Sequence, residues 1–407
     1  MEKQLTAQSP KKEIKRLLIA TTTFPRWEND SGPAPFVFEL ARFLKKYFQI
    51  TVLAPHFPGS ARQEVWKGME IIRFRYFFSA FEILADGRGL QNHFRESLKA
   101  KLLVGFLILG EFWAGFNLLR KRKYDAINSH WLIPSGLLFS ILAYWRKIPH
   151  ICTVHAGDFY LLLRIPLGKR LLRFIASRSR ALICVNQRMA ETIKKFFPQA
   201  QVYVMPMGVE VEKFSQIDPL RVNHLKKQIG IENEKIILFV GKLSEKKGIE
   251  WLLDAFELLL KEGGDFQLLL VGEGAQRKTL EEKAEKKGIG SRVNFLGAVP
   301  YPEIPYYYHL ADVVVVPSQI DRYGEGEGMP VVVLEALASG KPVVGSRYCF
   351  VPQELKASGF IEVELSPEEI ALGIKKALGN KHKPDGEILK RFSWQEVARF
   401  YVEVLKG

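Results

Sequence analysis

Cysteine is scarce in this sequence, which has three such residues among 407. The three, Cys152, Cys184 and Cys349, are odd in number, far apart and form no C-x-x-C pair. This argues against a disulfide framework or a zinc site and fits a reducing compartment. The apolar stretch after the polar, basic start, residues 17–20, is far too short for the core of a signal peptide, so we expect a cytoplasmic protein.

Acidic residues are sparse in the first half of the chain. Residues 1–200 contain 32 Lys and Arg but 14 Asp and Glu, whereas the remainder contains 27 and 30. The whole net charge of +15 therefore originates from the first half. Such asymmetry indicates an anionic partner, which could be a lipid surface, a nucleic acid or a phosphorylated substrate. The alternative is a charge that only keeps the folded surface soluble.

One long hydrophobic run is present. Residues 102–119 are apolar except for Glu111 and Asn117, and basic residues stand at both ends. A charge in the middle of the run argues against a membrane span. We expect a mostly buried helix in preference to one lying in a membrane interface, and the interfacial helix in preference to a span.

The length exceeds the size at which single hydrophobic cores usually stop growing, so two domains are expected. Two regions begin alike, each with a short apolar strand, a glycine-bearing loop and an amphipathic helix. In the first region we expect strands at residues 17–22 and 49–54 and a helix at 36–47. Alternation of this kind indicates parallel sheets covered by helices on both faces.

The second region continues the alternation. We expect strands at residues 236–240, 266–271, 293–297, 312–317 and 342–345, and helices at 249–260, 276–287, 329–339 and 394–405. We place the N-terminal domain at residues 1–205 and the C-terminal domain at 206–391. The last helix, about 392–407, is expected to pack back on the first domain.

The first motif is F-V-G-K-L-S-E-K-K-G, residues 239–248, in which a strand ends, the chain turns at Gly241 and a helix begins. Helix N-termini attract phosphate because their amides are unpaired and the helix dipole is positive there. Lys242 and Lys247 would neutralise a diphosphate in such a crevice. Taken alone, the motif favours two solvated lysines in a loop over a diphosphate site, because isolated motifs are weak signals.

The second motif is E-G-E-G-M-P-V-V-V-L-E-A-L-A-S-G-K-P-V-V, residues 325–344. Glu327 lies just before a helix and Glu335 lies within it. Because the helix begins between them, they are suited to hydrogen-bonding separate hydroxyls of an extended ligand. They are not suited to acting as a close acid–base pair. Gly326 and Gly328 would let backbone amides approach that ligand. The alternative is a glycine-rich turn before an ordinary helix.

Several stretches resemble motifs of the retaining glycosyltransferases of the GT-B fold, in the large family-4 group, and they occur along the chain in the family's order. The acidic motif is similar to the E-x7-E signature of that group, and the lysine motif to its diphosphate loop. Further similar stretches are F-P-R-W-E-N-D-S-G-P-A-P-F at residues 24–36, T-V-H-A-G-D at 153–158, M-P-M-G-V-E-V-E-K-F at 205–214 and V-G-E-G at 271–274. The resemblance covers nearly the whole chain.

The resemblance implies an α/β protein with two Rossmann-like domains that face each other across a cleft. It implies transfer of a sugar from a nucleoside-diphosphate donor, which is a substrate and not a cofactor, to a lipid-linked or glycan acceptor. Glu327 would contact the donor sugar and stabilise positive charge at its anomeric carbon, and His155 would contact the sugar near the acceptor. The implied catalytic residues are Glu327, His155 and Lys247. The implied donor-binding residues are Lys242, Lys247, Glu335, Gly32, Gly241, Gly328 and Met329, with Glu335 on the ribose hydroxyls and amides near Gly32 on the diphosphate.

Family members retain anomeric configuration and need no metal, since basic residues and helix dipoles stabilise the departing diphosphate. The sequence agrees, because it contains no D-x-D pair, the usual metal–diphosphate clamp of the other common transferase fold. One stretch departs from the family, which commonly has Gly-Gly-x-Pro-Glu after P-V-V-G-S. Here Cys349 and Phe350 replace the two glycines and Gln353 replaces the acid. The bulky residues are expected to change the donor or acceptor pocket.

Residues 165–180 are expected to form a basic amphipathic helix that begins at Pro166. Lys169, Arg170 and Arg173 lie mainly on a different face from the leucines. Such helices bind anionic membrane surfaces, or simply pack on their own domain. Because many family members glycosylate lipid-linked acceptors, we expect a peripheral protein at the inner face of the membrane.

The sequence gives weaker support to other functions. A dinucleotide oxidoreductase requires G-x-G-x-x-G, and V-G-E-G-A-Q-R lacks the third glycine. No nucleic-acid-binding motif accompanies the basic half, so we expect no nucleic-acid partner. A catalytically altered nucleotide-sugar-binding protein, or a phosphorylase or epimerase on the same fold, stays an alternative, because fold does not fix the reaction.

Overall fold

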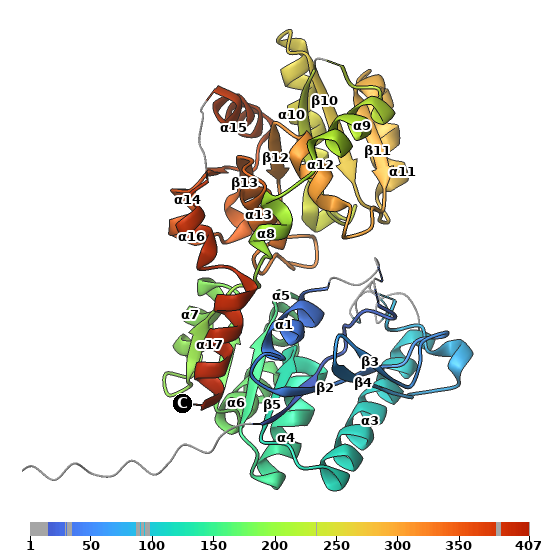
Figure 1. Cartoon of the computed structure of the whole chain (residues 1–407), viewed down its shortest axis with the longest axis vertical. Coiled ribbons are helices and arrows are strands. Elements are labelled where there is room, and N and C mark those ends of the chain that lie inside the picture. The colour runs from blue at the N-terminus through green and yellow to red at the C-terminus, as the bar shows by residue number, and fades with distance from the viewer. Residues whose placement is uncertain are drawn as a thin grey trace, which may run out of the picture.

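The computed structural model describes residues 15–28, 30, 35–86, 90, 93, 98–232, 234–379 and 384–406. Figure 1 shows two lobes, each with a sheet between layers of helices. Both sheets are built from strands that alternate with helices along the chain. The α/β class and the two parallel sheets predicted from the sequence are therefore confirmed.

The sheet of the first lobe runs in the order β3-β4-β2-β1-β5-β6-β7-β8. Its strands pair in parallel, and β3 is antiparallel to β4. The central strands β1, β5 and β6 are buried on both faces except for Arg16, as parallel sheets covered by helices require. The strands are β1 (Arg16–Ala20), β2 (Gln49–Pro55), β3 (Gln63–Trp66), β4 (Met69–Phe74), β5 (Ala126–His130), β6 (His150–Val154), β7 (Ala181–Cys184) and β8 (Val202–Val204).

The sheet of the second lobe is parallel throughout its described strands, in the order β11-β10-β9-β12-β13-β14. The four consecutive valines of β12 are all buried, which explains why this strand shows no polar alternation. The strands are β9 (Lys235–Val240), β10 (Phe266–Val271), β11 (Val293–Gly297), β12 (Val313–Val316), β13 (Val343–Ser346) and β14 (Phe360–Val363).

Helices cover both sheets and supply most of the lobe surfaces. In the first lobe they are α1 (Phe36–Leu44), α3 (Leu98–Lys121), α4 (Leu137–Arg146), α5 (Ala156–Arg164), α6 (Gly168–Arg178) and α7 (Gln187–Phe196). In the second they are α8 (Val211–Ser215), α9 (Pro219–Ile229), α10 (Ile249–Lys261), α11 (Arg277–Lys286), α12 (Ile304–Leu310), α13 (Val331–Ala338), α14 (Gln353–Lys356), α15 (Pro367–Gly379) and α16 (Gly386–Lys390). Short turns are η1 (Ser79–Phe81), η2 (Leu132–Gly136), η3 (Glu245–Lys247), η4 (Gly290–Arg292) and η5 (Arg347–Cys349).

The last helix, α17 (Trp394–Lys406), belongs to the first lobe. It lies beside α1 (Figure 1), and the hydroxyl of Tyr401 is 3.1 Å from that of Thr153 in β6. The chain thus passes between the lobes twice, after β8 and before α17. The two passages touch, since Val209 forms a β-bridge with Ser393.

The basic segment at residues 165–180 differs from its predicted form. Pro166 does not start the helix, because Leu167 adopts a left-handed conformation with φ 66° and α6 begins at Gly168. Leu172 and Ile175 of α6 are buried in the core of the first lobe. The apolar face of this helix is therefore packed on its own domain, and Lys169, Arg170 and Arg173 are exposed.

The apolar helix α3 is far more exposed than the sequence predicted. Only 22% of its most apolar 18-residue window is buried, so the expectation of a mostly buried helix was wrong. Among the described helices α3 alone is long and apolar enough to cross a membrane, by length and composition. The prediction failed because α3 is apolar on nearly all sides, and composition does not reveal which side meets the sheet.

Glu111, the charge that interrupts α3, points inward. Its Oε1 accepts a hydrogen bond of 2.5 Å from Ser135, and the side chain is fully buried. Burial raises the pKa of Glu111 to about 7. The carboxyl group therefore ties α3 to η2 instead of meeting solvent.

Glu111→Gln is expected to change how stability depends on pH. With a folded pKa of about 7 and an ordinary value of 4.5, the folded protein keeps a proton that the unfolded chain loses, so the free energy of unfolding falls as pH rises through this window. Glutamine resembles the protonated carboxyl, so the variant should exceed the wild type by about 3 kcal/mol at pH 8 and equal it at pH 4. Thermal unfolding across pH measures this, with Glu387→Gln as an exposed control. Parallel curves for wild type and variant would contradict it.

Candidate active site

Lys247 and Glu327 form a buried ion pair. The Nζ atom of Lys247 lies 3.0 Å from Oε1 of Glu327, and the two side chains are 15% and 11% exposed. Burial alone would raise the pKa of Glu327, but the charges of Lys247 and Lys246 outweigh it and lower that pKa. Glu327 is therefore ionised at neutral pH. The pair lies beyond the carboxyl ends of β9 and β12, where parallel sheets bind ligands.

Gly248 brings the lysine loop to this position. Its φ is +64°, and a Cβ atom there would lie 1.9 Å from the carbonyl oxygen of Pro317. Only glycine allows η3 to approach the end of β12 so closely. The loop begins at Gly241, whose amide donates to Val271, and continues with the exposed Lys242. Both predicted lysines thus lie on one loop, with Lys247 at the acidic motif.

Glu335 has a separate environment within α13. Its Oε2 accepts a hydrogen bond of 2.8 Å from the hydroxyl of Tyr308, and burial raises the pKa of the carboxyl. Tyr301 and Lys213 are its other polar neighbours. Glu327 and Glu335 therefore have different partners, and Glu335 is placed as a hydrogen-bonding group rather than as half of an acid–base pair.

His155 lies where β6 ends and α5 begins. Its Nε2 is 3.1 Å from Nδ1 of His130, which ends the neighbouring strand β5, and its ring centroid is 4.4 Å from that of Trp131. Burial lowers the pKa of His155 to about 3, and burial with the neighbouring ring lowers that of His130. At neutral pH both rings are uncharged, so His155 can offer hydrogen bonds but carries no positive charge.

Asp158, one turn into α5, fixes the segment after His130. Its carboxylate accepts a hydrogen bond from the backbone amide of Leu132 in η2. Burial raises its pKa to about 7, although backbone amides oppose this. Trp131 precedes Leu132 in the chain. Its indole Nε1 is buried and lacks a hydrogen-bond partner in the described part of the chain. It is a donor available to a ligand in this place.

The acidic motif of the second lobe touches the first lobe directly. The carbonyl oxygen of Gly328 accepts a hydrogen bond of 2.6 Å from Asn186. A Cβ atom on Gly328 would lie 2.6 Å from Val185 and 3.9 Å from Ala156, the residue after His155. Glu327 and His155 therefore stand on loops that meet across the lobes, although they are far apart in the sequence.

Gly328→Ala is expected to strain this contact. A Cβ atom 2.6 Å from Val185 requires the loops to separate, which should lower stability by about 1–2 kcal/mol and slow turnover. Gly326→Ala is a matched control, since its nearest atoms would be 3.7 Å away. Thermal unfolding and kcat/KM of both variants measure the difference. Equal values for the two variants would contradict it.

The stretch that departs from the family preserves a glycine-like backbone. Phe350 has φ 50° and ψ 43°, a left-handed conformation that glycine adopts without strain. The guanidinium carbon of Arg188, from α7 of the first lobe, lies 5.2 Å from the Phe350 ring centroid. Cys349 is buried beneath it. An aromatic ring and a cation thus occupy a place that two glycines would leave open.

Two of the predicted donor-binding residues, Gly32 and Met329, gain no side-chain contact to a ligand from the described part of the structure. Gly32 lies outside the described residues. The side chain of Met329 is buried in the core of the second lobe, so only its backbone could face a ligand. Within the described ranges, no group of three or more His, Cys, Asp and Glu could hold a metal ion.

Sequence reasoning missed several neighbours of the predicted site. Tyr160 of α5 has a buried hydroxyl without a hydrogen-bond partner among the described residues, and the charge of Glu327 contributes to its raised pKa after burial itself. Tyr308 hydrogen-bonds Glu335 from α12. Tyrosines in helices resemble ordinary core residues in a single sequence, and only the placement of the helices reveals these contacts.

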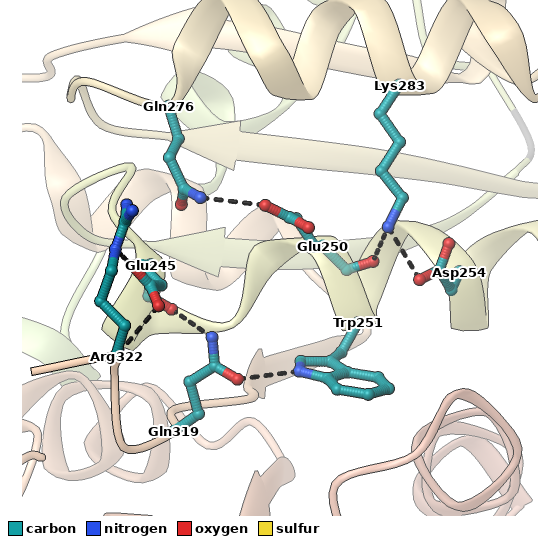
Figure 2. Close-up of a pocket in the computed structure, with 8 residues that line it drawn as sticks. All are labelled: Glu245, Glu250, Trp251, Asp254, Gln276, Lys283, Gln319 and Arg322. Atoms are coloured by element: carbon teal, nitrogen blue, oxygen red, sulfur yellow. Dashed lines mark hydrogen bonds and ion pairs between the residues drawn. The ribbon is translucent and has the colours of Figure 1, made fainter. Parts of the chain in front are cut away.

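A cavity of about 470 Å³ lies on the flank of the second lobe (Figure 2). Figure 2 shows acidic, basic and amide side chains around it, including the pair of Arg322 with Glu245. None of the predicted site residues lines it. A smaller cavity of about 200 Å³ lies between the lobes, lined by Phe38 and Arg42 of α1 and by Lys213 and Tyr301. The second cavity, beside the neighbours of Glu335, is the one adjacent to the predicted site.

Comparison with known families covers both lobes. The sequence model of glycosyl transferases group 1 matches residues 222–393, and that of Glycosyltransferase Family 4 matches residues 31–213. The chain belongs to this glycosyltransferase family. The matched regions include the lysine motif, the acidic motif and the His155 motif.

Individual proteins agree with this assignment. Alpha-monoglucosyldiacylglycerol synthase of Streptococcus pneumoniae is 28% identical over 57% of this chain and 54% of that enzyme. Sucrose-phosphate synthase of Thermosynechococcus elongatus shares the fold with a TM-score of 0.71 and 19% identity, covering 96% of this chain and 98% of that one. Anabaena HepE, solved in complex with UDP-glucose, has a TM-score of 0.67 and 16% identity, covering 96% and 99%. The enzyme therefore has the GT-B fold.

Proposed function

We propose that the enzyme transfers a sugar from a nucleoside-diphosphate donor to a hydroxyl group of a lipid-linked or glycan acceptor. The observation that carries this is the buried pair of Lys247 and Glu327, a cation and an anion at the carboxyl ends of parallel strands. A diphosphate would replace Glu327 as the partner of Lys247 and release the carboxylate toward the sugar. The UDP-glucose complex of a protein with this fold supports such a donor.

The chemistry follows from charge. As the glycosidic bond breaks, negative charge develops on the diphosphate, and Lys247 with Lys242 stabilises it most at that moment. Glu327 stabilises positive charge at the anomeric carbon. The neutral ring of His155 donates or accepts a hydrogen bond from the opposite lobe. Contact between the lobes would exclude water that otherwise hydrolyses the donor.

We further propose that transfer retains anomeric configuration and needs no metal. The family resemblance and the absence of a D-x-D pair from the sequence support this. A panel of UDP-, GDP- and ADP-sugars, tested for thermal stabilisation and for transfer with and without EDTA, identifies the donor and tests the metal. NMR of the product reports its configuration. Loss of transfer in EDTA that magnesium or manganese restores would overturn metal independence, and an inverted product would overturn retention.

An acceptor bound to lipid, and attachment at the inner face of the membrane, form the last part of the proposal. The diacylglycerol-linked product in the name of the pneumococcal relative supports the first. The positive excess of residues 1–200 supports the second. A phosphorylase on the same fold would instead release sugar phosphate when orthophosphate is added, and an epimerase would interconvert donors without an acceptor. The same donor panel separates these reactions.

A further inference from the structure

Helix α3 presents a continuous apolar stripe to its surroundings. Leu102, Phe106, Leu109 and Trp113 are 62%, 45%, 65% and 63% exposed. Their spacings of four, three and four residues place them on one face of the helix. Single exposed leucines are ordinary, but a row of four large apolar side chains marks an interaction surface.

The next helix, which packs against α3, also carries exposed aromatic side chains. Tyr144 and Trp145, at the end of α4, are 62% and 61% exposed, and the ring of Trp145 lies 6.3 Å from that of Phe112 in α3. We call Leu102, Phe106, Leu109, Trp113, Tyr144 and Trp145 the α3 patch. In Figure 1, α3 and α4 run along the outside of the first lobe, away from the second lobe. The α3 patch therefore lies on the side of the first lobe that is turned away from the second lobe.

Basic residues outnumber acidic ones around the α3 patch, although Arg122 is paired with Glu70 of β4 at 2.5 Å. Residues 98–147 contain eight Lys and Arg and two acids, Glu111 and Asp125. Glu111 is fully buried against Ser135, and Asp125 accepts backbone hydrogen bonds from Lys15 and Arg16. The basic residues lie near the ends of α3 and of α4, in the order Lys99, Lys101, Arg120, Lys121, Arg122, Lys123, Arg146 and Lys147.

We propose that the α3 patch docks on the surface of an anionic lipid membrane. Exposed tryptophan and tyrosine beside aliphatic residues suit the membrane interface, and the surrounding cations suit anionic headgroups. A second copy of this chain fits less well, since a two-fold interface would place the two basic surroundings against each other. The proposal rests on the lipid-linked acceptor proposed above, and it names the surface through which the enzyme reaches that acceptor.

The structure also determines how α3 meets the membrane. Gly115 packs against Phe139, with no room for a Cβ atom, and Glu111 binds Ser135, so one side of α3 stays on the protein. The helix therefore lies in the interface with only its outer side in the lipid. Helix α6 buries Leu172 and Ile175 in its own lobe, so it contributes positive charge more than apolar surface.

The test is co-sedimentation of the full chain with vesicles of phosphatidylcholine alone or of phosphatidylcholine mixed with the anionic lipid phosphatidylglycerol. Leu109→Glu with Trp113→Glu should lower the partition coefficient on anionic vesicles about 100-fold. The matched control is Leu220→Glu with Leu372→Glu, two exposed leucines of the second lobe at 77% and 60%. It should change binding less than about twofold. Thermal unfolding and nucleoside-diphosphate affinity of each variant show whether the fold and donor site are intact.

The outcomes separate the possibilities. Salt-sensitive binding by wild type and control, with loss in the α3 variant, supports the proposal. Equal binding by all three overturns it, as does a wild type that ignores anionic vesicles. A dimer in analytical ultracentrifugation that the α3 variant converts to monomer, without vesicle binding, assigns the surface to a second copy and also overturns it. Donor binding and hydrolysis are measured without vesicles, so failure of docking is distinct from failure of the proposed transfer reaction.

Discussion

Lys247→Ala is expected to weaken the binding of the donor nucleoside diphosphate by about 10- to 150-fold, because a charge-assisted contact of about 1.5–3 kcal/mol is lost. Lys242→Ala should weaken it less, since Lys242 is exposed and Lys247 is not. Isothermal titration with UDP and GDP measures both. Unchanged affinity in both variants would show that the two lysines do not bind the diphosphate.

Lys247→Ala should also lower the free energy of unfolding, because it breaks the ion pair with Glu327. Lys247 helps to lower the pKa of Glu327, so this carboxylate contributes stability that is present above the ordinary pKa and is lost as pH falls through the lowered value. Without Lys247 the carboxylate stays buried and burial raises its pKa, so the variant should lose about 3 kcal/mol near pH 8 and less near pH 4. Lys247→Ala combined with Glu327→Gln should recover most of the loss. A double variant no more stable than the single one would contradict the pairing.

Removal of residues 394–407 is expected to prevent the first lobe from folding. Seven side chains of α17 are buried, among them Trp394, Tyr401 and Leu405, and each of the large ones contributes about 1.5–3 kcal/mol. Their sum is comparable to the whole stability of a domain, about 5–15 kcal/mol. Solubility and hydrogen exchange in β1 and β6 measure the loss. Removal of residues 406 and 407 is the control, because Lys406 is exposed.

Tyr401→Phe isolates one contact of α17. The hydroxyl of Tyr401, 3.1 Å from that of Thr153, is removed while the ring stays. The expected loss is about 1 kcal/mol, far less than for the truncation. A shortened chain that unfolds at the wild-type temperature would show that α17 is not part of the core.

Regular elements were predictable because their signals are local. The strand at residues 266–271 and that at 293–297 have the predicted bounds, and the helix expected at 276–287 spans Arg277–Lys286. Apolar runs between glycines specify a buried parallel strand wherever it lies in the sheet. The predicted helix at 165–180 was less accurate, since Leu167 adopts a left-handed conformation that an apolar pattern does not reveal.

The site was predictable only in part. The sequence placed Lys247 and Glu327 on two loops after strands, and the sheet order brings them to 3.0 Å. It did not reveal that the pKa of His155 is lowered to about 3, because burial depends on the aromatic rings of Trp131 and Phe36 around it. Exposure of α3 was likewise hidden, since an apolar helix looks the same in sequence whether lipid or protein covers it.

The β-bridge between Val209 and Ser393 has a consequence for recombination. The chain enters and leaves the second lobe at adjacent points, so residues 210–392 form one continuous insert whose ends meet. Domains with adjacent ends tolerate exchange between proteins. The second lobe could therefore pass from one family member to another as a single segment, while the first lobe, completed by α17, stays behind unchanged.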